Sequence, residues 1–171
     1  YPIASTRLPC LNVTFASTAA AATGVLGALR AQKNDQTIVA AWAGDGGTSD
    51  IGIQSLSGAC ERGENFIFIC YDNEAYMNTG GQQSTATLPG TKTTTTTEPG
   101  LTGIRKKNIV EIMAAHGIPL AASASIGYLP DLRRKVELAR SLKGFKFIHV
   151  HTPCPTGWRL PPDQGVHIAR L

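Results

Sequence analysis

The sequence contains no hydrophobic run long enough to cross a membrane, and no signal-peptide pattern opens it. Charged residues are also scarce, at 16% of the 171 residues, whereas hydrophobic residues make up 42%. This composition excludes a disordered chain and predicts one globular domain with a single well-buried core. The low charge further predicts that a partner subunit covers part of the surface, and no membrane partner is expected.

The sequence also lacks a C-x-x-C pair, and its four cysteines are far apart, at Cys10, Cys60, Cys70 and Cys154. Cys60 falls in a predicted helix and Cys70 in an apolar strand, so both are predicted to be small core residues. A disulfide scaffold is not expected in a chain of this size. The cysteine pattern therefore favours a reducing, cytoplasmic location.

Aromatic residues are few and do not alternate with basic ones, which argues against a nucleic-acid partner. The net charge of +4 is scattered apart from two basic triplets, at residues 105–107 and 133–135. Both triplets fall at predicted helices, so we interpret them as solvated helix faces. An acidic protein partner is compatible with this charge.

Helical and strand patterns alternate along the chain. Helices are predicted over residues 15–31, 50–62, 106–116 and 130–142, and strands over residues 37–43, 66–71, 119–123 and 145–150. The first helix is Ala-rich, and Ser49 is the expected N-cap of the second. Residues 73–104 and the tail from Thr152 are predicted to be irregular. The alternation predicts an α/β fold, with a mostly parallel sheet and helices on both faces.

Three polar sequences follow predicted strands: Gly44-Asp45-Gly46, Asp72-Asn73 and His151 to Cys154. Parallel strands end at one edge of a sheet, where ligands of such folds bind. We therefore expect these three sequences to lie close together.

The glycines on either side of Asp45 allow a sharp turn and a close approach of the backbone to an oxyanion. The helix that follows would direct its N–H groups and its dipole at that oxyanion. Asp45 and Asn73 offer oxygen atoms to Mg²⁺, which takes about six oxygens at roughly 2.1 Å. The pattern predicts a site for a metal and a diphosphate; the simpler interpretation is a glycine turn with an Asp cap.

A GDG motif followed about two dozen residues later by Asn is typical of thiamine diphosphate enzymes. The longer string GDGGTSDIGIQSLSGACERGENFIFICYDNEAYMNTGGQQS, with PCPTGWR near the end, is more specific. It resembles the β subunit of pyruvate:ferredoxin oxidoreductase and of related 2-oxoacid:ferredoxin oxidoreductases, over nearly the whole chain. The resemblance implies a three-layer thiamine diphosphate-binding fold, with residues 1–171 as a single domain. Because the chain begins at Tyr1 rather than Met, we expect a piece of a longer β subunit.

The resemblance also assigns roles to matching positions. It implies that Mg²⁺ is bound by Asp45, by Asn73 and by the carbonyl oxygen of Ala75. The residues implied to bind thiamine diphosphate are Gly44, Asp45, Gly46, Gly47, Asn73, Tyr76, Asn78, Thr79 and Gly80. Asn78 is the implied catalytic residue, because the matching Asn lies near the reactive thiazolium carbon.

Cys154 matches the fourth thiolate of a [4Fe–4S] cluster in the same family, and such a cluster takes about four thiolates. The C-x-x-C pair that supplies other ligands in the family is not in this sequence, and Cys10 does not match its pattern. His149 and His151 lie two apart on a predicted strand and therefore on one face. We expect a structural or interface role for them rather than metal ligation.

The implied activity is oxidative decarboxylation of a 2-oxoacid, with pyruvate as the default, to an acyl-CoA. The implied cofactors are thiamine diphosphate, Mg²⁺ and the [4Fe–4S] cluster. The implied partners are coenzyme A, the 2-oxoacid, ferredoxin and further subunits, among them a pyrimidine-binding subunit that supplies a glutamate. The chain would then be half of an active site and inactive alone. Two alternatives stay open: a non-redox thiamine diphosphate enzyme (acetolactate synthase-like, or a 2-oxoacid decarboxylase), and a non-catalytic cofactor-binding subunit.

Overall fold

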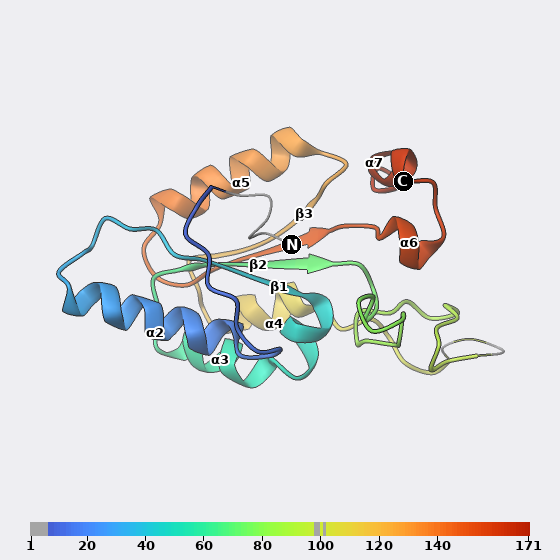
Figure 1. Cartoon of the computed structure of the whole chain (residues 1–171), viewed down its shortest axis with the longest axis horizontal. Coiled ribbons are helices and arrows are strands. Elements are labelled where there is room, and N and C mark those ends of the chain that lie inside the picture. The colour runs from blue at the N-terminus through green and yellow to red at the C-terminus, as the bar shows by residue number, and fades with distance from the viewer. Residues whose placement is uncertain (1–6, 98–99, 101) are drawn as a thin grey trace.

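The computed structural model describes residues 7–97, 100 and 102–171. Its four strands form one all-parallel sheet in the order β1-β2-β4-β3 (Figure 1). The strands are β1 (Ala40–Gly44), β2 (Ile67–Asp72), β3 (Leu120–Ser125) and β4 (Lys146–His151). Gly44 pairs with Tyr71 and Asp72 pairs with His151, so β1, β2 and β4 end at a common edge.

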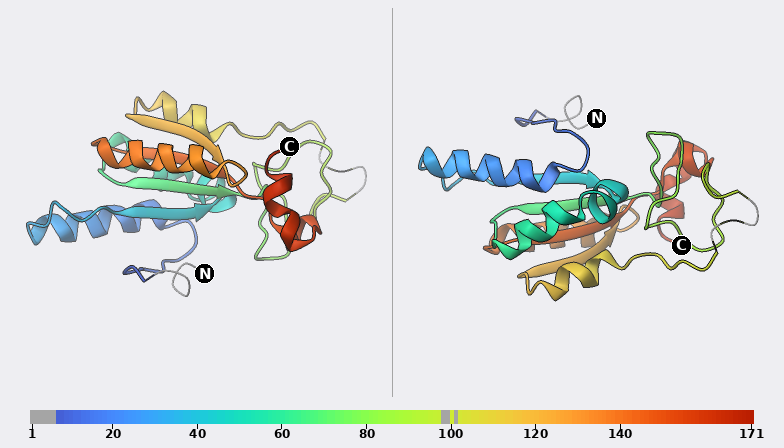
Figure 2. Two further views of the ribbon diagram at one scale, coloured as in Figure 1. Left: turned by 90° about the horizontal axis from the view of Figure 1, so that it is seen from above. Right: turned by 90° about the horizontal axis from the view of Figure 1, so that it is seen from below.

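Helices cover both faces of this sheet, which confirms the predicted α/β fold (Figures 1 and 2). One face carries α2 (Thr18–Ala31), α3 (Ile53–Glu61) and α4 (Ile109–Ala115), and the other carries α5 (Leu129–Ser141). The larger core lies under the first three helices, where Phe68 and Phe147 of neighbouring strands stack at 6.0 Å between ring centroids. None of the described helices combines the length and apolar character needed to cross a bilayer.

The helix that follows the GDG motif begins earlier than predicted. Helical geometry starts at Asp45 and continues through a π-helical turn, η1 (Gly46–Asp50), before α3 begins. The prediction that Ser49 is the N-cap was wrong, because Ser49 is buried inside this turn and Gly52 caps α3. A Cβ on Gly52 would lie 1.8 Å from the Gly47 carbonyl oxygen, so only glycine fits there. Turns of this kind are rare and frequently mark functional sites.

The helix α4 begins later than predicted, at Ile109. The side chain of its N-cap, Asn108, accepts a hydrogen bond from the Glu111 backbone N–H at 3.3 Å. Lys106 and Lys107 therefore precede the helix instead of lying on its face.

The C-terminal tail is folded, although an irregular tail was predicted. It contains α6 (Pro155–Trp158), a 3₁₀ turn η2 (Pro162–Gln164) and α7 (Gly165–Ile168). Tertiary hydrogen bonds hold it: the Trp158 indole N–H donates to the Asn73 carbonyl at 3.0 Å, and the Ser125 hydroxyl donates to the Ala169 carbonyl at 2.7 Å. The tail therefore lies beside the loop that follows β2, beyond the carboxyl ends of the strands (Figure 1).

Candidate functional site

Three oxygen-bearing groups meet where β1 and β2 end. The side-chain amide of Asn73 lies between the Asp45 carboxylate and the Ala75 carbonyl. With its nitrogen turned toward these two oxygens, the amide donates to Asp45 Oδ1 at 3.2 Å and to the Ala75 oxygen at 2.8 Å. Because β1 and β2 are neighbours in the sheet, the residue after β1 and the residue after β2 come together as their spacing predicted.

Asp45 is a buried carboxylate, with only 2% of its surface exposed. The Ser84 hydroxyl donates a short hydrogen bond to its Oδ2. Burial raises the pKa of Asp45 to about 6; the hydrogen bond from Ser84 opposes this rise and the charge of Asp72 adds to it. A bound cation would strongly favour the ionised form of a carboxyl group that is buried in this way.

The turn after β2 is built around Glu74, whose φ of +69° is unusual for a residue with a Cβ. Three contacts hold this conformation. The Glu74 N–H donates to Asp72 Oδ1 at 2.8 Å, the Thr87 hydroxyl donates to the Glu74 carbonyl at 2.6 Å, and the Glu74 carboxylate pairs with Lys106. The turn reverses the chain so that the Ala75 carbonyl faces the Asn73 amide.

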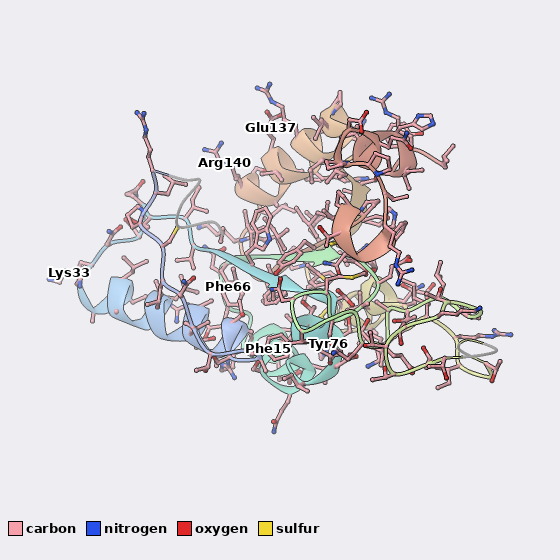
Figure 3. The ribbon with its side chains drawn as sticks, turned by 45° about the vertical axis from the view of Figure 1, so that its right-hand side comes forward. Phe15, Lys33, Phe66, Tyr76, Glu137 and Arg140 are labelled. Atoms are coloured by element: carbon pink, nitrogen blue, oxygen red, sulfur yellow. The ribbon has the colours of Figure 1, made fainter. Side chains whose placement is uncertain are left out.

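Aromatic rings pack against the glycines that follow Asp45, and at Gly46 the ring leaves no room for a side chain. A Cβ on Gly46 would lie 2.2 Å from Tyr76 Cε1, and a Cβ on Gly47 would lie 3.3 Å from the Phe15 ring. The two rings contact each other, with centroids 6.0 Å apart (Figure 3). The Tyr76 hydroxyl donates to Asp50 Oδ2 at 2.8 Å, so this ring is fixed across the η1 turn.

A cavity of about 330 Å³ opens beside these groups. Most of the predicted cofactor residues line it: Gly44, Asp45, Gly46, Gly47, Asn73, Ala75, Tyr76, Asn78 and Thr79. Gly80 and Cys154 are not among its lining residues. Their assigned roles, like those of the lining residues, stay predictions.

Half of the cavity wall comes from residues that the sequence did not point to. They are Val13, Thr14, Phe15, Ala16, Thr18, Trp42, Ala43, Tyr71 and Met77. The first five precede or begin α2, and the prediction had merged residues 15–17 into that helix. A Ser-Thr pair at the start of an Ala-rich segment is typical of a helix N-terminus and could have shown that the chain turns there.

The middle of the long loop after β2 is packed onto the site. Ser84, Ala86 and Thr87 are buried. Thr85 donates from its backbone N–H to Asp50 Oδ2 at 3.2 Å and from its hydroxyl to Asp50 Oδ1. Ser84 contacts Asp45 and Thr87 contacts the turn at Glu74. The segment therefore contacts the buried carboxylate, the end of η1 and the turn after β2.

Lys106 and Lys107 also reach the site, so the prediction of a solvated helix face at residues 105–107 was wrong for them. Lys106 Nζ lies 2.6 Å from Asp72 Oδ2 and 2.9 Å from Glu74 Oε1. Lys107 Nζ donates to the Ser49 carbonyl and lies 3.8 Å from Asp50 Oδ1. In the second triplet, Arg133 and Arg134 are exposed on α5, as predicted.

Asp72 is the centre of this buried charge cluster. His149 Nε2 also contacts its Oδ2, at 2.8 Å, which gives His149 a structural role of the kind expected. Burial alone would raise the pKa of Asp72, but the hydrogen bond with His149 and the charge of Lys106 outweigh it and lower that pKa. The second histidine, His151, packs on the Trp158 ring with centroids 5.7 Å apart.

The cysteines divide into core and surface positions. Cys60 and Cys70 are buried as predicted, and burial raises the pKa of Cys60 to about 12. Cys154 is half-buried and caps α6, where its sulfur accepts from the Gly157 N–H at 3.4 Å. Within the described part of the chain, no three His, Cys, Asp or Glu side chains are grouped so that they could hold a metal ion between them. Cluster ligation by Cys154 therefore remains a prediction.

A parallel α/β sheet with a glycine turn, a buried carboxylate and a cavity at its carboxyl edge defines a nucleotide- or cofactor-binding domain. Residues 4–150 match the family model of the thiamine pyrophosphate enzymes, C-terminal TPP binding domain. The chain belongs to this family.

Its relatives confirm the resemblance to oxidoreductase β subunits. Over its whole length the chain is 51% identical to pyruvate synthase subunit PorB of Methanothermobacter marburgensis and 44% identical to ketoisovalerate oxidoreductase subunit VorB of Pyrococcus horikoshii. It spans only 60% and 58% of the length of these two relatives.

Solved structures agree on the fold. A 2-oxoglutarate:ferredoxin oxidoreductase from Magnetococcus marinus, solved with 2-oxoglutarate, coenzyme A and succinyl-CoA bound, matches 91% of this chain and 58% of its own, with a TM-score of 0.71 and 22% identity. A putative thiamin diphosphate-dependent enzyme from Mycobacterium smegmatis matches 82% of this chain and 22% of its own, with a TM-score of 0.58. At this level of identity the likeness concerns the fold alone.

Proposed function

We propose that this chain supplies the Mg²⁺- and diphosphate-binding half of a thiamine diphosphate site in a 2-oxoacid:ferredoxin oxidoreductase. The observation that carries the proposal is the spacing of Asp45, Asn73 and Ala75. Neighbouring ligands in an octahedral Mg²⁺ shell lie roughly 3.0 Å apart, given metal–oxygen distances of about 2.1 Å. The Asn73 amide lies 3.2 Å from Asp45 Oδ1 and 2.8 Å from the Ala75 oxygen. A half-turn of this amide exchanges nitrogen for oxygen, and the Asn73 oxygen then lies from each of its two neighbours at the spacing that a shared Mg²⁺ would give.

The diphosphate would lie against the start of η1. The first N–H groups of a helical segment have no partners within it and attract anions. Gly46 and Gly47 are buried at this position and line the cavity. Because neither has a Cβ, their N–H groups can approach an oxyanion directly.

Bound thiamine diphosphate would supply the carbanion chemistry that decarboxylation of a 2-oxoacid needs. The residues of this chain would bind and orient it. Asp45, Asn73 and the Ala75 carbonyl would hold the cation, and the Tyr76 ring forms one wall of the cavity. Asn78 is exposed and lines the same cavity, where its amide can donate a hydrogen bond to a substrate or accept one.

The site is proposed to be completed by a second subunit. Phe15 and Trp42 line the cavity, yet 61% and 55% of their surfaces are exposed. Among the described lining residues Asp45 is the one carboxylate, so the glutamate that activates the cofactor would come from a pyrimidine-binding partner. A partner seated on the two rings would also exclude water from the cavity.

The redox steps are proposed from the names of the relatives. Electrons would pass through a [4Fe–4S] cluster, with Cys154 as a candidate ligand, to ferredoxin, and coenzyme A would take the acyl group in the cytoplasm. Pyruvate is the default substrate, because the relative at 51% identity is named pyruvate synthase.

Calorimetric titration of the complete protein with thiamine diphosphate, in Mg²⁺ and in excess EDTA, tests the cofactor site. We expect binding that requires Mg²⁺, a loss of about 100-fold or more in Asp45→Asn, and no change in the exposed control Asp163→Asn. Binding that EDTA does not affect would contradict the metal site. In the complex with the partner subunits, reduction of a viologen dye that depends on 2-oxoacid and coenzyme A tests the redox activity. Release of CO₂ without dye reduction would favour the non-redox alternative.

A further inference from the structure

Two consecutive lysines at the end of the long loop before α4 reach two different parts of the candidate site. We call residues 72–75 the magnesium loop and residues 46–50, which form η1, the diphosphate turn. We propose that Lys106 is a positioning residue for the magnesium loop and Lys107 a positioning residue for the diphosphate turn. The inference rests on the proposed function, because it assumes that these two segments bind Mg²⁺ and diphosphate.

Lys106 joins the residues on both sides of the proposed ligand Asn73. Its ammonium group lies 2.6 Å from Asp72 Oδ2 and 2.9 Å from Glu74 Oε1. Asp72 is 1% exposed and the Lys106 side chain 26%, so solvent screens the pair only in part. The Lys106 ammonium group therefore anchors Asp72 and Glu74, the two chain neighbours of Asn73.

The magnesium loop needs such an anchor because of its backbone conformation. Glu74 has a φ of +69°, and a residue with a Cβ in this region costs about 1–3 kcal/mol unless its surroundings hold it there. Asp72 accepts from the Glu74 N–H, and Lys106 binds both side chains. Loss of the ammonium group would leave two close carboxylates and would favour relaxation of the turn that presents the Ala75 carbonyl.

Lys107 acts on the other segment. Its backbone N–H donates to the Thr85 carbonyl at 2.8 Å, and its ammonium group contacts the Ser49 carbonyl and the Asp50 carboxylate. Asp50 ends η1 and also accepts from the Tyr76 hydroxyl at 2.8 Å. Lys107 therefore fixes the far end of the diphosphate turn and, through Asp50, the ring that packs against Gly46.

A purely structural role makes a different prediction from a positioning role. If the lysines only stabilised the fold, their loss would lower the free energy of unfolding without separating the affinity for metal from the affinity for diphosphate. If they position two different segments, Lys106 variants lose affinity for the metal, whereas Lys107 variants lose affinity for the diphosphate.

The test is a pair of titrations on the complete protein with Lys106→Met and Lys107→Met. One measures the Kd of Mg²⁺ at saturating thiamine diphosphate, and the other the Kd of thiamine diphosphate at saturating Mg²⁺. For Lys106→Met we expect a Kd of Mg²⁺ about 10- to 100-fold higher, with the affinity for thiamine diphosphate restored by excess Mg²⁺. For Lys107→Met we expect that excess Mg²⁺ does not restore it.

Two controls belong to this experiment. Lys106→Arg keeps the charge and should stay within about threefold of wild type, because the guanidinium can bridge the same carboxylates. Lys143→Met removes an exposed lysine before β4, at the other end of the sheet, and should change neither Kd.

The outcomes separate the two levels of the proposal. A folded Lys106→Met protein that binds Mg²⁺ as tightly as wild type overturns the inference while the proposed function stands. A wild-type protein that binds neither Mg²⁺ nor thiamine diphosphate overturns the proposed function itself. If Lys106→Met does not fold, the double variant Asp72→Asn with Lys106→Met removes both charges of the pair, and an unchanged Kd of Mg²⁺ there also overturns the inference.

Discussion

Ser84 donates a hydrogen bond from its hydroxyl to Oδ2 of Asp45, across 39 positions of the sequence. Both residues are buried, and Ala86 donates from its N–H to the same serine oxygen at 3.2 Å. The contact orients the carboxylate so that its other oxygen, Oδ1, faces the Asn73 amide. The long loop after β2 therefore helps to hold the site in place.

Replacing Ser84 with Ala should weaken the binding of Mg²⁺. The substitution leaves a buried carboxylate with one hydrogen-bond donor fewer, which costs about 1–3 kcal/mol of stability and frees the carboxylate to rotate. We expect the Kd of Mg²⁺ to rise by about 10-fold or more in a calorimetric titration. Ser141→Ala, at an exposed position that ends α5, is the matched control. Equal affinity in the two variants would show that Ser84 does not orient Asp45.

Replacing Gly46 with Ala should destabilise the protein, because the new methyl group would lie 2.2 Å from Tyr76 Cε1. Either the ring or the diphosphate turn must move, and overpacking of this kind costs about 1–3 kcal/mol. Urea unfolding measures the loss. The control is Gly24→Ala in α2, where a Cβ meets nothing within 4 Å; it should stabilise the protein by about 0.5–1 kcal/mol. Adding Tyr76→Ala to Gly46→Ala should recover part of the loss if the clash causes it.

The pH dependence of stability should reveal the Asp72 cluster. The pKa of Asp72 in the folded protein lies below its usual value of 3.8, so its contribution is present above about pH 4 and is lost as the pH falls through the folded pKa. Asp72→Asn should thus be less stable than wild type at pH 7, and the difference should shrink below about pH 4. Urea unfolding between pH 3 and pH 7 measures it. The raised pKa of Asp45 makes stability fall as the pH rises, which is the opposite trend. Asp45 is present in both proteins, so taking their difference cancels most of its effect. A difference that does not change with pH would exclude the ion pair as its source.

The sequence predicted the strands because each is a short apolar run, and it predicted the edge of the site because parallel strands end together. It did not predict the half of the cavity wall that includes Phe15 and Trp42. These residues reach the site only through the position of β1 at the edge of the sheet and the turn before α2. The four-residue helices of the tail are too short for a periodic pattern, and tertiary hydrogen bonds such as that from Trp158 hold the tail in place.

The two lysines were misinterpreted for a different reason. Helical periodicity alone does not fix where a helix begins, and the predicted helix was extended over Lys106 and Lys107. The cap signal was present, because Asn108 is followed three residues later by Glu111, as in a capping box. Placing the helix start there frees both lysines to reach the carboxylates of the site.

Replacing Asn78 with Ala should lower turnover without weakening the cofactor site. Asn78 is exposed and lines the cavity, on the loop beyond the magnesium ligands. The family resemblance counts it among the residues that bind thiamine diphosphate, but near the reactive carbon and not at the metal or the diphosphate. A single amide that stabilises a developing charge is worth about 10²–10³ in kcat. We therefore expect a loss of this order in dye reduction, while the Kd values of Mg²⁺ and thiamine diphosphate stay within about twofold. Gln32→Ala, at the exposed end of α2, should change neither quantity. A parallel loss of cofactor affinity would instead make Asn78 a binding residue, and unchanged turnover would remove it from the reaction.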